Sequence, residues 1–215
     1  MNKLVIFDLD DTLLCADSEL HFTKYVVKQG MLDKDFYIKK IKSFDKDYRS
    51  GNLNFKDYMR FLLNPLIGKT KNELDLLVTS FINSSKDVLI DDLTFKLLEK
   101  HKEDRLLIAS GALDFVVKGF ANFFKVKEYI GTKTEFIENK VTGETTGEPN
   151  FDKGKLINVS EWCMKNKLNL EDATFYTDSI HDLHLVKKCK NSIVVSPDAR
   201  LKRHAENNNL QIINR

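Results

Sequence analysis

The sequence predicts an α/β fold in which a mainly parallel sheet forms the core and a helical cap is inserted after the first strand. Three observations predict it. Short apolar runs recur along the chain, helical patterns separate most of them, and one long stretch after the first run is helical throughout. The length of 215 residues and the apolar content of 42% are typical of a globular chain that buries a sizeable core.

The predicted strands are short, apolar and bounded by polar or turn residues. They lie at residues 4–7, 106–109, 174–176, 193–195 and 211–213. Helical patterns lie between most of them, at residues 113–124, 155–165 and 180–187. This alternation predicts βαβ connections and a sheet that is covered on both faces.

Residues 17–87 interrupt the alternation. Four amphipathic stretches follow one another there without a strand candidate, at residues 18–29, 34–48, 54–63 and 71–84. An insertion at this point predicts a cap over the carboxyl edge of the sheet, where open α/β sheets bind ligands. The predicted domains are a core of residues 1–16 and 88–215 and a cap of residues 17–87. A glycine-containing segment at 132–147 predicts a β-hairpin.

Charge and cysteine content narrow the function classes. The chain has 34 Lys and Arg against 32 Asp and Glu, so we expect neither nucleic acid nor a membrane surface as a partner. No apolar run reaches the roughly 20 residues of a membrane span, and no signal-peptide pattern precedes the first strand. Three scattered cysteines predict a reduced, cytoplasmic protein without structural zinc. The sequence does not indicate an oligomeric state.

The first motif with chemical content is VIFDLDDTLL at residues 5–14. Because side chains alternate along a strand, Asp8 and Asp10 leave the strand end on the same side. Two crowded carboxylates repel each other unless a cation, a shared proton or a reaction uses both. The alternative is an aspartate-rich turn that only caps the next element.

Three further segments carry residues that could bind a metal or an anion. TFYTDSIHDL places Asp178 after a predicted strand and Asp182 one helical turn later, where both could also simply cap a helix. LLIASGA ends a strand in Ser110 and Gly111 before a helix, a setting in which a hydroxyl and free N–H groups hold anions. FDKGKLINV places Lys155 near a helix start, where a lone lysine is ordinarily just solvated.

In this order the four motifs resemble the haloacid dehalogenase-like (HAD) phosphatase superfamily. Within it, the chain resembles the branch of phosphoserine phosphatase and related small phosphatases that carry a helical cap after the first motif. The resemblance runs from FDLDDTL through YRSGNLNFKDYMRFLLNPLIG to YTDSIHDLHL and VVSPD. It implies a HAD-like Rossmannoid core and a Mg²⁺-dependent phosphomonoesterase that acts on a small phosphorylated metabolite through an aspartyl-phosphate intermediate.

The resemblance also implies a role for each motif residue. Asp8 would be the nucleophile and Asp10 the general acid and base. Asp8, Asp178 and the main-chain carbonyl of Asp10 would coordinate Mg²⁺, while Asp182 would complete or orient the ligand shell. Ser110, Gly111 and Lys155 would bind the phosphoryl group. Thr12 would support the motif loop.

Several assignments stay open at this point. Lys153, two residues before Lys155, is an alternative for the motif lysine. Asp17 falls where phosphoserine phosphatases usually present a glutamate to the amino group of the substrate. Arg49 and Arg60 in the cap would either clamp a carboxylate or a second phosphate of the substrate or lie on the surface beside cap aromatics.

Charge also supports a metal. Four ionised aspartates beside a phosphate dianion carry about six negative charges, which need cations such as Mg²⁺ and Lys155 before they are desolvated. Two other functions fit the same residues. One is phosphotransfer to another hydroxyl, as in a mutase, and the other is a non-catalytic regulatory module that binds a metal or an anion.

Overall fold

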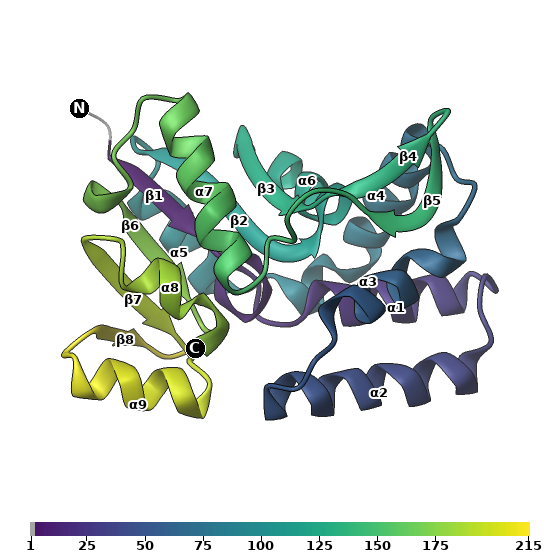
Figure 1. Cartoon of the computed structure of the whole chain (residues 1–215), viewed down its shortest axis with the longest axis horizontal. Helices are drawn as coiled ribbons and strands as arrows, with labels where there is room; N and C mark the ends of the chain where they lie inside the picture. The colour runs from purple at the N-terminus through teal and green to yellow at the C-terminus, as the bar shows by residue number, and fades with distance from the viewer. Residues whose placement is uncertain (1–2) are drawn as a thin grey trace.

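A computed structural model describes residues 3–215, except for the side chain of Arg49 (Figure 1). Its centre is a six-stranded sheet with the order β3-β2-β1-β6-β7-β8, in which all neighbouring strands are parallel. The strands are β1 (Leu4–Phe7), β2 (Arg105–Leu113), β3 (Glu128–Thr132), β6 (Thr174–Thr177), β7 (Asn191–Val195) and β8 (Gln211–Ile213).

Helices cover both faces of this sheet (Figure 1). They are α5 (Asp92–Lys100), α6 (Asp114–Phe123), α7 (Lys153–Lys165), α8 (Leu183–Val186) and α9 (Ala199–Asn207). Because strand side chains alternate, Val5 and Phe7 join one buried cluster, with α5 and α6, and Leu4 and Ile6 join another, with α7 and α8. The fully apolar sequence of β1 is therefore explained by burial on both sides.

The stretch between β1 and β2 is helical. It forms α1 (Ser18–Lys28), α2 (Lys34–Ser50), α3 (Phe55–Leu63) and α4 (Lys71–Leu89). A capping side chain precedes each helix and accepts a hydrogen bond from a backbone N–H of its first turn. The capping residues of α1 to α4 are, in order, Asp17, Asp33, Asn54 and Thr70. Gly51 ends α2 in the left-handed conformation, with φ 77°.

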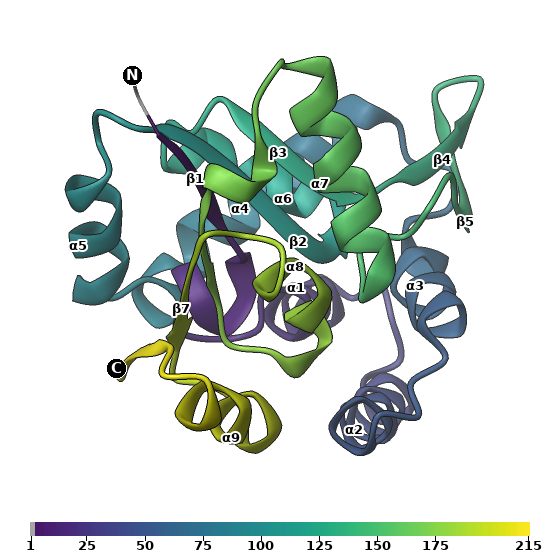
Figure 2. The same cartoon turned by 60° about the vertical axis from the view of Figure 1, so that its left-hand side comes forward.

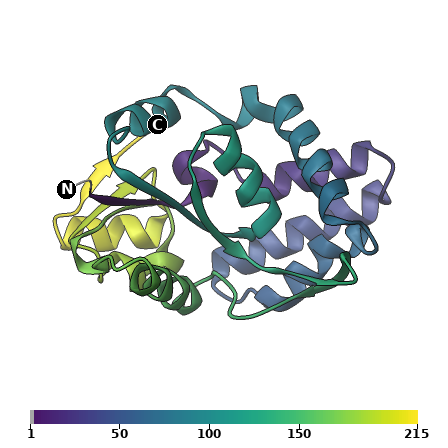
Figure 3. The same ribbon diagram turned by 90° about the horizontal axis from the view of Figure 1, so that it is seen from above.

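These helices lie at the opposite end of the molecule from β7, β8 and α9 (Figures 1 and 3). One buried apolar cluster runs from the sheet into α1, α3 and α4, and α4 packs against α6. The division into a core of 1–16 and 88–215 and a cap of 17–87 stays a prediction, because the packing is continuous across it.

The predicted α/β fold class with a parallel, doubly covered sheet is confirmed. The five predicted strands are present, and residues 132–147 contain the antiparallel pair β4 (Thr134–Ile137) and β5 (Lys140–Thr145). Sequence reasoning missed α5, α9 and β3. The strand β3 lies at the sheet edge with half-exposed side chains, so it lacks the apolar run of its neighbours. In the described part of the chain, no helix is long and apolar enough to cross a membrane.

Candidate active site

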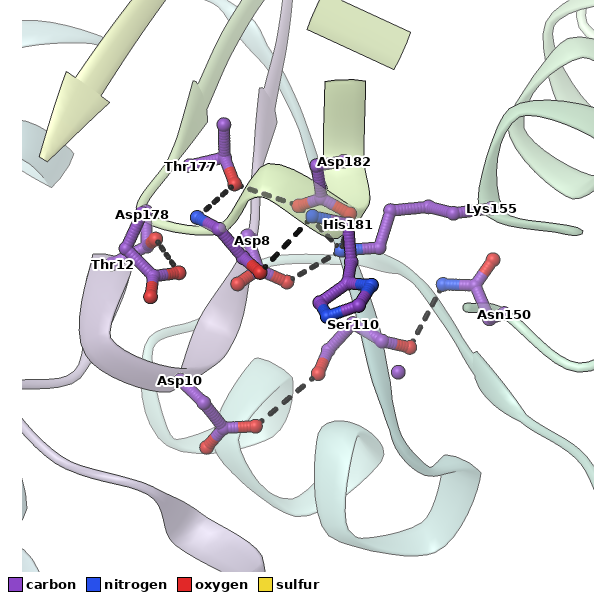
Figure 4. Close-up of polar contacts among 12 residues, drawn as sticks. Asp8, Asp10, Thr12, Ser110, Asn150, Lys155, Thr177, Asp178, His181 and Asp182 are labelled. Atoms are coloured by element: carbon purple, nitrogen blue, oxygen red, sulfur yellow. Dashed lines mark hydrogen bonds and ion pairs between the residues drawn. The ribbon is translucent and has the colours of Figure 1, made fainter. Parts of the chain in front are cut away.

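The carboxyl ends of three neighbouring strands meet at one pocket. Because β2 and β6 both pair with β1 in parallel, Asp8 after β1, Ser110 in β2 and Asp178 after β6 come to the same sheet edge. All three line a cavity of about 160 Å³, together with Lys155 and Asp182 (Figure 4). The four motifs that are far apart in the sequence are thus brought together.

Lys155 is the centre of a buried ion cluster. Its ammonium donates to Oδ1 of Asp8 at 2.8 Å and lies 2.7 Å from Oδ1 of Asp182. Thr177 at the end of β6 donates its hydroxyl to Oδ2 of Asp182 at 2.7 Å. All four side chains are buried. Asp182 is thereby engaged by a lysine and a hydroxyl, which fixes the direction of the Lys155 ammonium toward Asp8.

The two charges of the central pair stabilise each other. Burial acts to lower the pKa of Lys155, but the charges of Asp182 and Asp8 outweigh it and raise the pKa above its ordinary value. Burial raises the pKa of Asp8 to about 6, against the opposing charge of Lys155. At neutral pH the lysine is therefore charged and the Asp8 carboxylate is mostly ionised.

The carboxyl group of Asp10 points toward the start of the cap. It lies in the turn Leu9–Leu13 and accepts the backbone N–H of Ser18 at 2.6 Å, while Ser110 donates its hydroxyl at 3.4 Å. Burial and the charge of Asp17 raise the pKa of Asp10 well above its ordinary value. A raised pKa favours the protonated form of a carboxyl group, which is the form that serves as a general acid.

The backbone around Ser110 is held by a residue that sequence reasoning missed. Asn150 is fully buried and donates its side-chain amide to the carbonyl of Ser110 at 2.8 Å. The hydroxyl of Ser110 also accepts the N–H of Ala112 at 3.1 Å. A Cβ at Gly111 would meet its nearest neighbours at 3.7 Å, an ordinary contact. The described protein atoms therefore do not by themselves require glycine at this position.

The residues present fit a divalent cation between Asp8 and Asp178. Thr12 donates its hydroxyl to Oδ1 of Asp178 at 3.2 Å. Burial and the charge of Asp8 raise the pKa of Asp178 well above its ordinary value, so a bound cation would stabilise both ionised groups. Among the described residues, no three His, Cys, Asp or Glu side chains surround one metal position. The predicted ligand set, with the carbonyl of Asp10 and with Asp182, stays a prediction.

The alternatives left open by the sequence are placed as follows. Lys153 is exposed, whereas Lys155 is buried and donates a hydrogen bond to Asp8. Arg60 donates to both carboxylate oxygens of Glu144, at 2.7 and 2.9 Å, and about half of its side chain is exposed. The side chain of Arg49 lies outside the described residues, so its predicted role in substrate binding stays a prediction.

The cap completes the pocket with acidic and aromatic side chains. Asp17, predicted to face the substrate, lines the pocket and also caps α1 by accepting the N–H of Leu20 at 2.8 Å. Glu19, which sequence reasoning missed, is buried and accepts the N–H of Leu113 at 3.0 Å. Burial and the charge of Asp17 raise the pKa of Glu19 well above its ordinary value. A cation in this part of the pocket would stabilise the ionised forms.

Aromatic rings form much of the remaining wall. They come from both sides of the pocket, as Phe44, Tyr48, Phe55 and Tyr58 from the cap and Phe151 and His181 from the core. The sequence offered a partial signal for this wall, because the cap aromatics lie at helical spacing in one stretch. It offered none for Phe151, whose place depends on the loop before α7.

Comparison with known proteins assigns the chain to a family. A sequence model of the haloacid dehalogenase-like hydrolases matches residues 5–187. The chain belongs to the haloacid dehalogenase-like hydrolase family. A histidinol-phosphatase from Neisseria meningitidis serogroup C (strain 8013) is 28% identical to it over 220 residues, covering 100% of this chain and 99% of the relative. The predicted family and the predicted class, a phosphoric monoester hydrolase, are confirmed.

Solved structures of other proteins share the fold of this chain. A protein of unknown function from Bordetella pertussis Tohama I superposes with a TM-score of 0.90 at 24% identity, covering 99% of both chains. A substrate-bound phosphoserine phosphatase superposes with a TM-score of 0.68 at 18% identity, covering 99% of this chain and 93% of the other. At these identities the likeness shows the fold alone.

Proposed function

We propose that this haloacid dehalogenase-like phosphatase hydrolyses a small phosphomonoester through an aspartyl-phosphate intermediate on Asp8. The observation that carries the proposal is the buried contact of 2.8 Å between Lys155 and Asp8, at the edge where β1, β2 and β6 end. A lysine fixed beside an ionised carboxylate offers positive charge where phosphoryl oxygens arrive. Phosphate monoesters hydrolyse very slowly in water, so a nucleophile and preorganised charge are both needed.

The proposed reaction has two steps. In the first, a carboxylate oxygen of Asp8 attacks phosphorus, the bond to the leaving oxygen breaks, and Asp10 gives its proton to that oxygen. In the second, Asp10 takes a proton from a water molecule that attacks phosphorus, which frees Asp8 and releases phosphate. The raised pKa of Asp10 suits the first step, because it favours the protonated form that gives a proton to the leaving oxygen.

Two residues are proposed to hold the phosphoryl oxygens. Lys155 acts as a point charge, and Asp182 positions it by accepting from its ammonium. Ser110 adds a hydroxyl at the opposite side, supported through its backbone by Asn150.

We propose that Asp8, Asp178 and the main-chain carbonyl of Asp10 hold Mg²⁺, which requires oxygen ligands of this kind. When bound, the ion supplies positive charge that offsets the buried carboxylates and polarises the phosphoryl group. Thr12 orients Asp178 through its hydroxyl.

The cap half of the pocket favours a substrate with a positively charged amino group. Asp17, Glu19 and Asp45 line this half beside aromatic rings, which attract cations through their faces. Among the described residues that line the pocket, Lys155 is the one lysine or arginine, and it is already bound to Asp8 and Asp182. We therefore propose histidinol phosphate, the substrate class named for the Neisseria relative, ahead of phosphoserine, which brings an additional carboxylate.

The test is phosphate release by the wild-type protein and Asp8→Asn from a panel of histidinol phosphate, phosphoserine, phosphoethanolamine and p-nitrophenyl phosphate with Mg²⁺. We expect the wild-type protein to release phosphate and Asp8→Asn to do so at least roughly 10³-fold more slowly, because the amide is not a nucleophile. An unchanged rate in the variant would refute the role of Asp8. Transfer of phosphate to a second alcohol without release would favour a mutase, and no turnover at all would favour a binding module.

A further inference from the structure

The C-terminal turn of α2 carries a polar contact between the cap and the core. The hydroxyl of Tyr48 lies 2.7 Å from Oγ of Ser179, and either atom can donate. Ser179 directly follows Asp178, and its Oγ also accepts the N–H of His181. This hydroxyl pair therefore joins α2 to the loop of residues 178–182, which holds both acidic residues of the last motif.

Aromatic contacts surround this hydrogen bond. The ring centroids of Tyr48 and His181 are 4.8 Å apart, as are those of Phe151 and His181. Phe55 at the start of α3 stacks on Phe151 at 4.5 Å. Rings from two cap helices, from the segment before α7 and from the short 3-10 helix Ile180–Asp182 thus touch one another along the pocket wall.

A third contact lies at the end of α2. Arg200 of α9 reaches His181, with its Nη2 3.2 Å from Nε2 of the ring. A Cβ at Gly51 would lie only 3.2 Å from Nη1 of Arg200, so the guanidinium packs against the turn that ends α2. A cation in this place also suits the negative end of the helix dipole. In Figure 1 this end of α2 points toward α9, and in Figure 2 both helices lie at the bottom of the view.

We propose that Tyr48 is a positioning residue, whose hydroxyl bond to Ser179 and ring contact with His181 hold α2 against the loop 178–182 and keep the pocket closed over the phosphoryl site. This adds to the proposed phosphatase function, and its structural part holds whatever the substrate is. One net hydrogen bond shifts a closing equilibrium by roughly 2- to 10-fold. Its loss opens the site to water and loosens the loop that carries Asp178 and Asp182.

The first test is hydrogen exchange of the substrate-free protein, which does not depend on turnover. In Tyr48→Phe we expect amides of the C-terminal half of α2 and of residues 178–182 to exchange roughly 2- to 10-fold faster than in the wild type. The matched control is Tyr37→Phe. It removes the same atom from the same helix, but Tyr37 accepts from Asn64 within the cap, at 3.1 Å. We expect wild-type exchange at both segments in the control. Wild-type exchange in Tyr48→Phe would overturn the proposal.

The second test is a double-mutant cycle on phosphate release with Tyr48→Phe, Ser179→Ala and both together. Each single variant should lose roughly 2- to 10-fold in kcat/KM, and the double variant should lose no more than the larger single loss. The cycle cancels the separate contact of Ser179 with the N–H of His181. Losses that multiply in the double variant would overturn the coupling. Faster exchange in Tyr48→Phe, together with no phosphate release by the wild-type protein, would instead refute the proposed function and leave the positioning role of Tyr48 standing.

Discussion

The sheet half and the cap half of the pocket hold their carboxylates differently. In the sheet half, Asp8 and Asp182 share the ammonium of Lys155, and the backbone N–H of Asp8 donates to the carbonyl of Tyr176 in the neighbouring strand at 2.9 Å. In the cap half, Asp17 and Glu19 accept backbone N–H groups, and aromatic rings surround them. In the sheet half a lysine therefore offsets the charges of Asp8 and Asp182, whereas in the cap half Asp17 and Glu19 have uncharged hydrogen-bond donors as partners.

This difference separates reaction from recognition. Parallel pairing of β1, β2 and β6 places Asp8, Ser110 and Asp178 at one edge, and α7 brings Lys155 against Asp8, regardless of the substrate. The cap half is built from helices whose packing sets the size and charge of the space left for the leaving group. We therefore expect substitutions in the sheet half to lower turnover of all substrates, and substitutions in the cap half to change the preference among them.

Removal of the metal should have the largest effect. With a chelator we expect phosphate release to fall to background and to return with Mg²⁺, since the ion would supply positive charge beside the phosphoryl group and stabilise the ionised forms of Asp8 and Asp178. Independently of turnover, Mg²⁺ should raise the Tm of the wild-type protein by ligand linkage, and Asp178→Asn should lose most of that increase. Full turnover in chelator would contradict the metal role.

Lys155→Met should come next. We expect a loss of roughly 10³-fold in kcat/KM for every substrate, because the phosphoryl-binding charge is gone. The Tm should fall by roughly 10 °C, since Asp8 and Asp182 are left buried without their partner. Lys153→Met is the matched control two residues away, at an exposed position, and should behave like the wild type. Equal losses in both variants would show that the assignment of the motif lysine is wrong.

The sheet half was largely predictable from the sequence. Its motifs follow apolar strands, and strand alternation with parallel pairing brings Asp8, Ser110 and Asp178 to one edge without knowledge of packing. The apolar residues at its +1 and +4 positions and its spacing to Asp178 favoured Lys155 over Lys153, and in the structure Lys155 contacts Asp8 while Lys153 is exposed. Asn150 was not predictable, because its role depends on a loop that folds back under Ser110.

The cap half was predictable only as a helical insertion. The helices follow from amphipathic periodicity and from N-capping residues such as Asp17 and Asp33. Which side chains enter the pocket depends on how the helices cross, and no local pattern encodes that. Glu19 and Arg60 illustrate this dependence on helix packing. Glu19 lines the pocket, whereas Arg60 does not and forms an ion pair with Glu144.

A substitution in the cap half should separate substrates. In Asp17→Asn we expect KM for histidinol phosphate to rise roughly tenfold, because a charge-assisted contact to the amino group is weakened. The rate with p-nitrophenyl phosphate, which lacks an amino group, should change by less than about twofold. Asp33→Asn is the control, since Asp33 caps α2 in the same way at an exposed position and asparagine also caps helices well. A parallel loss for both substrates in Asp17→Asn would mean that the residue acts through Asp10 or through the fold, and not on the amino group of the substrate.

Arg60→Ala should have the smallest effect, although the sequence placed Arg60 beside Arg49 as a possible substrate clamp. Its guanidinium is engaged by Glu144 of β5 on the outer side of the cap, where both side chains are about half exposed. Exposed ion pairs contribute little to stability, so the Tm should stay within about 2 °C of the wild type. KM for amine-bearing and carboxylate-bearing substrates should also stay unchanged. A tenfold rise in KM confined to phosphoserine would instead place Arg60 in contact with the substrate carboxylate, and would show that the cap closes further around bound ligand than the described contacts indicate.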